Sequence, residues 1–389
     1  MGIIMNPKDC SILAICNLPT YNNNAYQDYD PTYYNHLFPL YNSYEPGSTF
    51  KSITYASALN ENLFDMYKDT YYDKGYVVVE GRTIKSWKKG GHGLQTFLEV
   101  LQNSSNPGFV EIGRRLGKDK LYQYIKDFGF LDKTGVDIQG ENKGIFFSYD
   151  NFNLLEQATT SFGQGISVTA IQLVRAFCAL INGGYIYQPY IVKKVVNPLN
   201  NETIYEKNNQ PLRQVITLDT SNKMRTALES VVSKGTGRKA YVDGYRVGGK
   251  TGTSQIAENG KYLDGQYILS FIAGAPMNDP KIVCYVAMKK PHNCIQYGGT
   301  TVGPIISKII ESSLLLLNVE KNYDGIEREY TWMDKKSYKV ENYIGKNKKD
   351  CKSKYYTFVF KGTGDKVIDQ LPKYGEMITE GSVVMIQLD

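Results

Sequence analysis

Three β-favouring segments follow one another after residue 245, and this succession restricts the fold more than any other feature of the sequence. Successive strands joined by turns form antiparallel sheets. Two further runs, Ile3 to Met5 and Ser11 to Ile15, flank Asn6-Pro7-Lys8-Asp9, whose turn chemistry predicts a hairpin. We therefore expect an α/β protein of the α+β type, built on an antiparallel sheet. The three later strands are Tyr245 to Lys250, Tyr267 to Ala273 and Ile282 to Met288.

Helices are expected where apolar residues recur at a spacing of three or four. Pro46-Gly47 favours a helix start before Ser48 to Leu59, which would place Ser48 at a helix N-terminus. Residues 20 to 45 are rich in Asn, Tyr, Asp and Pro without either period, and they predict a long surface segment. The other predicted helices are Thr96 to Gln102, Val110 to Leu116, Thr169 to Ile181 and Pro304 to Leu317, the last covering the sheet.

Length and composition bound the class of protein. With 389 residues, 42% of them hydrophobic and 22% charged, the chain can form one large domain and a small one. The net charge of +6 is mild and the lysines are scattered, which argues against a nucleic-acid partner. The six cysteines lie far apart without a Cys-x-x-Cys pair, and the three histidines have no ligand-spaced partner. We therefore predict no metal, no cofactor and no Ser-His-Asp triad.

Membrane and export signals are not evident in the sequence. The longest purely aliphatic run, Leu314 to Leu317, is far too short to cross a bilayer of roughly 30 Å. Residues 1 to 7 lack both a basic region and a long apolar region. We therefore expect neither an export signal nor an anchor in this chain.

Ser48-Thr49-Phe50-Lys51 is a Ser-x-x-Lys motif. On a helix this spacing puts the hydroxyl and the amine on one face, where the amine can take the hydroxyl proton. Ser86-Trp87-Lys88-Lys89 matches the same motif, but it lies in a Gly- and Lys-rich stretch with no apolar period behind it. The surroundings therefore favour Ser48 as the nucleophile.

Lys250-Thr251-Gly252 also has a rival in Lys133-Thr134-Gly135. Lys250 ends an apolar strand after two glycines and is followed by Thr253-Ser254-Gln255, so hydroxyls and an ammonium can line one strand edge. The Lys133 copy follows Phe128 to Asp132, where a turn between helix and strand is the simpler interpretation. We therefore place the functional copy at Lys250.

Ser104-Ser105-Asn106 lies between these two motifs in the sequence. Ser-x-x-Lys, a Ser-Asp-Asn type element and Lys-Thr-Gly together are the signature of β-lactamases and penicillin-binding proteins. Each motif alone is weak, whereas their occurrence in this order is a strong signal. For other polar candidates we predict no catalytic role: His92 between two glycines is typical of a turn, and Cys294 near His292 is no catalytic dyad.

With their surroundings, these motifs resemble the transpeptidase domain of class B penicillin-binding proteins, the peptidoglycan D,D-transpeptidases of division and sporulation. Tyr44 to Lys51 is similar to the nucleophile segment of that domain. Ala170 stands where Pro is usual, and we expect it to alter a helix start rather than the chemistry. The resemblance implies the penicilloyl-serine transferase fold, in which helices cover a five-stranded antiparallel sheet beside an all-helical subdomain. Further similar segments are Asn6 to Asp9, Gly91-His92-Gly93, Phe162 to Thr169 and Gly235-Thr236-Gly237.

The C-terminal residues resemble a PASTA module, a small α+β domain. The likeness rests on Val340 to Gly345, Gly362-Thr363-Gly364 and Gln370-Leu371-Pro372. Glu341 stands where Pro is common, and the helical portion near Asn347 to Lys354 is short, so a spacer or docking role stays open beside muropeptide binding. We expect a transpeptidase domain at 1–320, a linker at 321–338 and the PASTA-like domain at 339–389, ending in a closing or edge strand.

The resemblance also implies a role for each motif residue. Ser48 attacks the penultimate D-Ala of a donor stem peptide, and Lys51 acts as the base, which requires a pKa about 3 units below its ordinary 10.4. Ser104 relays the proton to the leaving amine, and Asn106 holds the substrate amide and Lys51. Lys250, Thr251, Gly252 and Thr253 bind the donor carboxylate, and the backbone N–H groups of Ser48 and Thr253 form the oxyanion hole.

Two other functions use the same motifs. A D,D-carboxypeptidase or serine β-lactamase would deliver the acyl group to water, and a non-catalytic β-lactam or cell-wall sensor would acylate without turnover. The implied partners are peptidoglycan stem peptides with an amine acceptor, β-lactam antibiotics and other cell-wall assembly proteins. The implied location is the extracytoplasmic face of a bacterial cell membrane.

Overall fold

The computed structural model describes residues 1–258, 261–325, 337–379 and 381–389. The chain forms two compact units, Met1–Glu327 and Arg328–Asp389. Most of the predicted linker at 321–338 lies outside the described residues. None of the described helices is long and apolar enough to span a bilayer.

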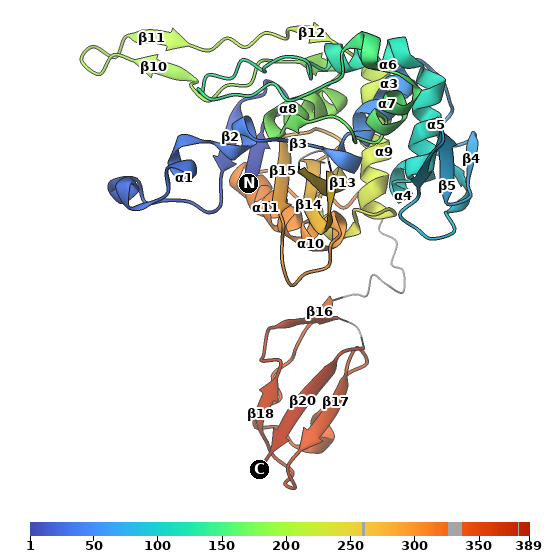
Figure 1. Cartoon of the computed structure of the whole chain (residues 1–389). Coiled ribbons are helices and arrows are strands. Elements are labelled where there is room, and N and C mark those ends of the chain that lie inside the picture. Colours follow the sequence, from blue (N-terminus) through green and yellow to red (C-terminus); the bar gives the residue numbers. More distant parts are fainter. Residues whose placement is uncertain (259–260, 326–336, 380) are drawn as a thin grey trace. The chain divides into compact units, whose positions relative to one another are not determined.

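A five-stranded sheet in the order β13-β14-β15-β1-β2 forms the centre of the first unit (Figure 1). All of its neighbouring strands are antiparallel, as the sequence predicts. The predicted N-terminal hairpin joins this sheet because β1 pairs with β15, for example Ile3 with Tyr285. β13 is left at one edge and carries Lys250-Thr251-Gly252. The strands are β1 Gly2–Met5, β2 Ile12–Cys16, β13 Gly248–Glu258, β14 Lys261–Ala275 and β15 Ile282–Lys289.

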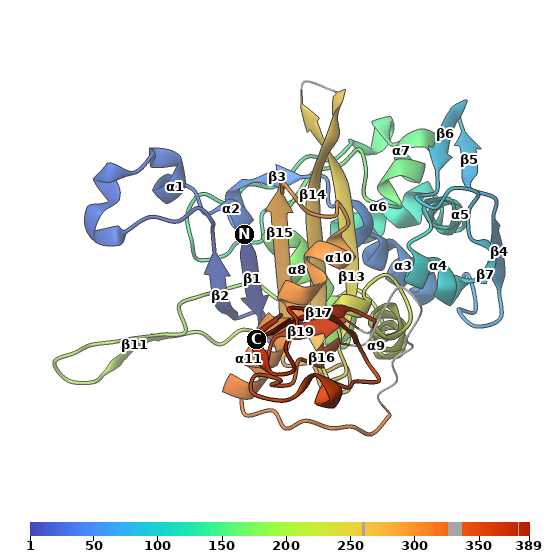
Figure 2. The same ribbon diagram turned by 90° about the horizontal axis from the view of Figure 1, so that it is seen from below.

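Helices cover both faces of this sheet (Figures 1 and 2). Side chains alternate along a strand, so Phe271 of β14 packs in the cluster of α11, Gly303–Leu316, whereas Ile272 packs in the cluster of α8, Ala170–Ile181. Every residue of α8 is buried. Its first residue is Ala170, and the helix keeps a capping box, so the departure from Pro leaves the helix start intact.

A largely helical part lies beside the β13 edge. Its central helix is α3, Lys51–Asn60, which packs against α5, α8 and α9 and is buried along nearly its whole length. Two strand ribbons that the sequence analysis did not predict, β4 with β7 and β5 with β6, accompany the helices. Glu80 and Gly81 have positive φ and form the two-residue turn between β5 and β6. The remaining elements are α4 Phe97–Asn103, α5 Asn106–Leu116, α6 Lys118–Asp127, α7 Leu154–Thr160, α9 Leu218–Ser233, β4 Thr70–Asp73, β5 Tyr76–Val79, β6 Arg82–Lys85 and β7 Gly93–Thr96.

Residues 20 to 45 differ from the predicted irregular segment because they contain three short helices. Asn22 accepts a hydrogen bond from the backbone of Asn24, and Asp30 accepts one from Thr32, so both residues cap helices. Helices of four to six residues are too short to show a helical period in the sequence. These helices are η1 Asn23–Asp28, α1 Pro31–Asn35 and α2 Phe38–Tyr41.

Short elements complete the first unit. β3, Ser43–Tyr44, pairs with β8, Val168–Thr169, and so joins the segment before Ser48 to the start of α8. β10, Lys194–Val196, and β11, Thr203–Glu206, form a ribbon that extends away from the body (Figure 1). The others are η2 Gly47–Thr49, η3 Tyr149–Asn151, η4 Arg238–Ala240, α10 Gly298–Thr301, β9 Tyr185–Ile186 and β12 Arg213–Gln214.

The second unit is a small mixed sheet with its own core. Its last strand, β20, was predicted at an edge or as the closing strand, but it is central and pairs with β17 in parallel and with β18 in antiparallel. The predicted helical portion near Asn347 to Lys354 is reduced to one short 3-10 turn, η5. Tyr343, Val384 and Ile386 are buried in the core. The elements are β16 Ser337–Lys339, η5 Lys348–Asp350, β17 Thr357–Lys361, β18 Val367–Leu371, β19 Met377–Thr379 and β20 Val383–Leu388.

Candidate active site

Ser48 lies in the 3-10 turn η2, which runs directly into α3. The Phe50 N–H donates to Gly47 O at 2.9 Å, so the turn is helical and Ser48 stands one turn before Lys51. Gly47 has φ +52°, and a Cβ on it would lie 2.2 Å from Ser254 Oγ of β13. Glycine therefore lets this turn approach the edge strand closely. Ser48 is partly exposed, which suits a residue that meets a substrate.

Lys51 is fully buried under Ser48 in the first turn of α3. Its ammonium group donates to Ser104 O at 2.7 Å, Ser104 Oγ at 3.1 Å and Asn106 Oδ1 at 2.7 Å. It also lies 5.3 Å from the centre of the Phe109 ring. The amine is therefore held by Ser104-Ser105-Asn106, the second motif in chain order, and it is shielded from water.

Ser104-Ser105-Asn106 occupies the junction between α4 and α5. Ser104 caps α4 in the left-handed conformation with φ 56°, and Ser105 caps the N-terminus of α5. The Asn106 side-chain amide donates to Lys85 O at 3.1 Å while its oxygen accepts from Lys51. The reversal at this junction turns the side chains of Ser104 and Asn106 toward Lys51.

Lys250, of the third motif in chain order, Lys250-Thr251-Gly252, also contacts the Ser104 hydroxyl. Its buried ammonium donates to Ser104 Oγ at 2.9 Å and to Thr251 O at 3.2 Å. Ser104 Oγ therefore lies between the amines of Lys51 and Lys250. The structure thus joins the predicted residues Lys51, Ser104, Asn106 and Lys250 in one hydrogen-bonded cluster.

The two buried amines have unusual proton affinities. Burial, and then the positive charge of Lys250, hold the pKa of Lys51 well below its ordinary value, and the charge of Asp73 opposes them. Burial alone lowers the pKa of Lys250 to about 7. The environment therefore favours the uncharged form of both amines relative to an ordinary lysine, and the uncharged form is the state a base requires.

Asp73, at the end of β4, is a buried acid beside this cluster that the sequence analysis did not single out. Its carboxylate accepts from the Gly75 N–H at 2.8 Å, Ser86 Oγ at 3.1 Å and Ser105 Oγ at 2.8 Å. It therefore connects β4 to Ser105, at the junction between α4 and α5, and it supplies the negative charge that acts on Lys51. No spacing rule marks Asp73, because its partners are remote in the sequence.

Both rival motifs have structural roles. Ser86 donates to Asp73, as described, and does not join the amine cluster. Thr134 donates to the Glu141 carboxylate through its backbone N–H at 2.6 Å and its hydroxyl at 2.5 Å, so the Lys133 copy is a carboxylate-bound turn. Cys294, for which no catalytic role was predicted, accepts hydrogen bonds from the Gln296 side chain at its backbone oxygen and its sulfur.

The strand after Lys250 forms a small-residue edge. The hydroxyls of Thr251 and Thr236 lie 3.3 Å apart, and the Gly298 N–H donates to Thr253 Oγ1 at 3.1 Å. A Cβ on Gly252 would lie 2.2 Å from Ser270 Oγ and 2.9 Å from Thr49 Cγ2. Gly252 therefore allows β13 to fit closely between β14 and the turn that carries Ser48.

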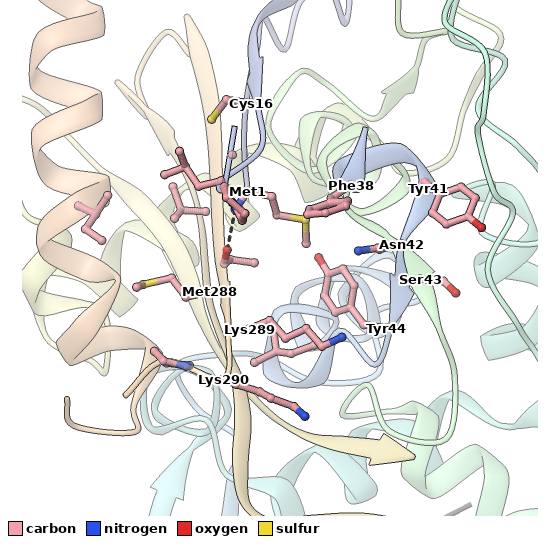
Figure 3. Close-up of a pocket in the computed structure, with 18 of the residues that line it drawn as sticks. Met1, Cys16, Phe38, Tyr41, Asn42, Ser43, Tyr44, Met288, Lys289 and Lys290 are labelled. Carbon is pink, nitrogen blue, oxygen red and sulfur yellow. Dashed lines mark hydrogen bonds between the residues drawn. The ribbon is translucent and has the colours of Figure 1, made fainter. Parts of the chain in front are cut away.

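A separate cavity of about 960 Å³ lies away from this cluster (Figure 3). It is lined largely by apolar side chains of β1, β14, β15 and α11 and of the segment before Ser48, with Lys289 and Lys290 at one side (Figure 3). None of the four clustered residues lines it. Among the described residues, no group of three or more His, Cys, Asp or Glu side chains could hold a metal ion.

Comparison with known proteins decides the family. The family described as the penicillin binding protein transpeptidase domain matches residues 1–311. The chain belongs to this family. It is 48% identical over 390 residues to stage V sporulation protein D of Bacillus subtilis, covering 100% of this chain and 60% of that protein. It is 32% identical to a peptidoglycan D,D-transpeptidase FtsI homolog of Mesostigma viride, covering 84% of this chain and 58% of the relative.

A solved penicillin-binding protein structure agrees with the fold. The apo transpeptidase domain of Burkholderia pseudomallei penicillin-binding protein 3 superimposes with a TM-score of 0.70 at 29% identity, covering 82% of this chain and 89% of that chain. The predicted class of fold, an antiparallel sheet covered by helices, is therefore confirmed. The chain spans only about 60% of the length of the curated relatives named above.

Proposed function

We propose that this chain is a peptidoglycan D,D-transpeptidase that forms an acyl-enzyme on Ser48. One observation carries the proposal: Lys51 follows Ser48 by one helical turn, and the buried amines of Lys51 and Lys250 share the hydroxyl of Ser104. The names of the relatives support it, because several are peptidoglycan D,D-transpeptidases.

In the acylation step, Ser48 Oγ attacks the carbonyl carbon of the penultimate D-Ala, and uncharged Lys51 takes its proton. The C–N bond then breaks, and the terminal D-Ala leaves as an amine after receiving a proton. Ser104 Oγ relays this proton, since it lies within hydrogen-bond distance of both amines. The product is an ester between Ser48 and the donor stem peptide.

In the second step, an amine of a neighbouring stem peptide attacks the ester carbon. A new C–N bond forms, the C–O bond to Ser48 breaks, and the proton lost by the amine returns to Ser48 Oγ through the same base. The first step breaks one peptide bond and the second step forms one, so the overall reaction consumes no cofactor or energy source. A β-lactam would enter as a donor mimic and remain on Ser48 as a slowly hydrolysed ester.

We assign recognition of the donor carboxylate to the edge strand β13, and stabilisation of the oxyanion to β13 together with the turn that carries Ser48. The Lys250 ammonium, Thr251 and Thr253 bind the terminal carboxylate of the donor, and a bound carboxylate favours the charged form of Lys250. The backbone N–H groups of Ser48 and Thr253 form the oxyanion hole. The tight approach of Gly47 to Ser254 and of Gly252 to Thr49 supports this assignment, because it brings the two backbones together.

Two parallel assays, one of labelling and one of acyl transfer, test the proposed function. The protein is incubated with a fluorescent penicillin, and separately with an acyl-D-Ala-D-Ala donor and a D-amino acid acceptor. We expect stable labelling, release of D-Ala and formation of the new amide. Rapid loss of label with hydrolysed drug would instead indicate a β-lactamase, acid product alone a carboxypeptidase, and labelling without any turnover a sensor.

Asp73 is expected to set the pH at which Ser48 becomes reactive. In Asp73→Asn the ammonium form of Lys51 loses the carboxylate that favours it, so the pKa of Lys51 falls further. The acid limb of the labelling rate therefore moves to lower pH. We also expect a loss of about 1–3 kcal/mol in the free energy of unfolding, because an amide replaces a charged acceptor of three donors.

The measurement is the rate of penicillin labelling against pH, with urea unfolding beside it. Lys250 and His92 also interact with Lys51 and are unchanged in this variant. Asp69→Asn, at an exposed site just before β4, is the matched control. An acid limb that stays in place or moves to higher pH in Asp73→Asn would refute the electrostatic role.

We further propose the arrangement of the whole protein. Residues 1–320 would be the transpeptidase domain, 321–338 a linker and 339–389 a PASTA-like module that binds muropeptides or serves as a spacer. The similarity to stage V sporulation protein D favours sporulation as the process. The site would act on the extracytoplasmic face of the membrane, among other cell-wall assembly proteins.

A further inference from the structure

Trp87 is attached to the loop that presents Ser104. Its indole N–H donates to Asn103 O at 2.8 Å, and Asn103 is the last residue of α4, directly before Ser104. The His92 ring packs edge-on against the indole at 5.4 Å. The position of the Trp87 ring is therefore fixed relative to the second motif.

Tyr297 lies beside the Lys-Thr-Gly strand, where the backbone of its segment is attached. It is the N-cap of α10, and the N–H of the next residue, Gly298, donates to Thr253 Oγ1. A Cβ on Gly298 would lie 2.2 Å from Gly252 O, so this segment lies directly on the edge strand. The backbone that carries the Tyr297 ring is therefore held against the Lys-Thr-Gly strand.

The two rings meet between these motifs. Their centroids are 6.2 Å apart and their planes are inclined at 63°, an edge-to-face contact. Trp87 is 50% exposed and Tyr297 is 52% exposed, whereas Ser104 and Lys250, which join the same two elements by a hydrogen bond, are buried. The ring pair is thus a second connection between the segments that carry these two motifs, and it is exposed where the hydrogen bond between Ser104 and Lys250 is buried.

We propose that Trp87 and Tyr297 form an aromatic gate that directs the Ser48 acyl group to an amine acceptor rather than to water. This inference rests on the proposed function. Hydrolysis and transfer break the same C–O bond of the ester and differ only in whether water or an amine attacks the carbonyl carbon. Apolar ring surface beside the Ser104 and Lys250 motifs disfavours water there, and it can contact the aliphatic part of an acceptor side chain.

The gate is tested by the ratio of two products from one reaction. An acyl-D-alanyl thioester donor is mixed with a D-amino acid acceptor, and the free acid and the amide are quantified. We expect Trp87→Ala and Tyr297→Ala each to raise the acid-to-amide ratio about three- to tenfold, the range that follows from losing one aromatic contact. Partial misfolding lowers both enzymatic products together, whereas spontaneous hydrolysis of the thioester adds free acid. The acid formed in a protein-free reaction is therefore subtracted before the ratio is taken.

Two controls separate the gate from other roles. Trp87→Phe keeps an aromatic ring but removes the donor to Asn103 that positions it, so its product ratio is expected to lie between those of the unmodified protein and Trp87→Ala. Tyr26→Ala removes an equally exposed ring in the 20 to 45 segment and should change nothing. An unchanged ratio in both alanine variants, or equal shifts in Trp87→Ala and Trp87→Phe, would overturn the gate. Absence of any amide from the unmodified protein would instead refute the proposed function.

Discussion

Ser48→Ala is expected to abolish penicillin labelling and to lower the rate of acyl transfer by about a millionfold, the size of effect that removal of a serine nucleophile has. The reason is chemical, because no other hydroxyl stands one helical turn before the buried Lys51. Stability should change little, since Ser48 is partly exposed. Labelling with fluorescent penicillin and thermal unfolding of the same sample measure both effects.

The matched control for this variant is Ser86→Ala. Ser86 heads the other Ser-x-x-Lys motif, but its hydroxyl donates to Asp73. We expect this variant to keep the covalent label and to lose about 1 kcal/mol of stability through the missing hydrogen bond. Labelling that disappears in Ser86→Ala and persists in Ser48→Ala would show that Ser86, and not Ser48, is the nucleophile.

Lys51→Met is expected to slow acylation of Ser48 by about 10²- to 10⁴-fold, the usual contribution of a general base. Methionine fills much the same volume, so the fold is retained. It leaves Ser104 O and Asn106 Oδ1 without the amine donor, which costs about 1–3 kcal/mol. The kinetic loss should persist at high pH, because the variant has no amine to deprotonate.

Stopped-flow labelling between pH 6 and pH 10, with circular dichroism to confirm folding, measures this prediction. Lys51→Arg is a second test, because arginine stays protonated throughout that range and cannot act as the base. A Lys51→Met protein that labels at the ordinary rate would show that another group removes the proton. Lys250 would then be the first alternative, since it donates to the same Ser104 hydroxyl.

The sequence was enough to predict the sheet and the nucleophile helix from local patterns, and the three motifs in their order predicted the four clustered residues. The local patterns were β-favouring runs at β14 and β15, a Pro-Gly entry before Ser48, and turn residues between α4 and α5. The left-handed conformation of Ser104 was not predictable, because nothing local favours it and the contacts of the junction hold it.

Other features depended on long-range contacts. Asp73 and Trp87 contact the segment of Ser104-Ser105-Asn106 from positions before it in the sequence. Asp73 belongs to no motif, and Trp87 stands at a variable position of the rival Ser-x-x-Lys motif. The short helices of residues 23 to 41 gave no period, and β20 was placed at an edge because its sequence does not reveal how many neighbours it pairs with. The roles of Asp73 and Trp87 and the place of β20 require knowledge of which segments meet in space, whereas the short helices were missed because they span too few residues to show a period.

The state of the Lys51 amine is the most direct test of the account. Nuclear magnetic resonance of protein with nitrogen-15 at the lysine side chains follows each amine through a pH titration, and Lys51→Met assigns the signal. We predict that the Lys51 amine loses its proton at a pH well below the ordinary lysine value of about 10.4. A Lys51 signal that titrates at or above that value would contradict the account, because Ser48 would then have no base beside it.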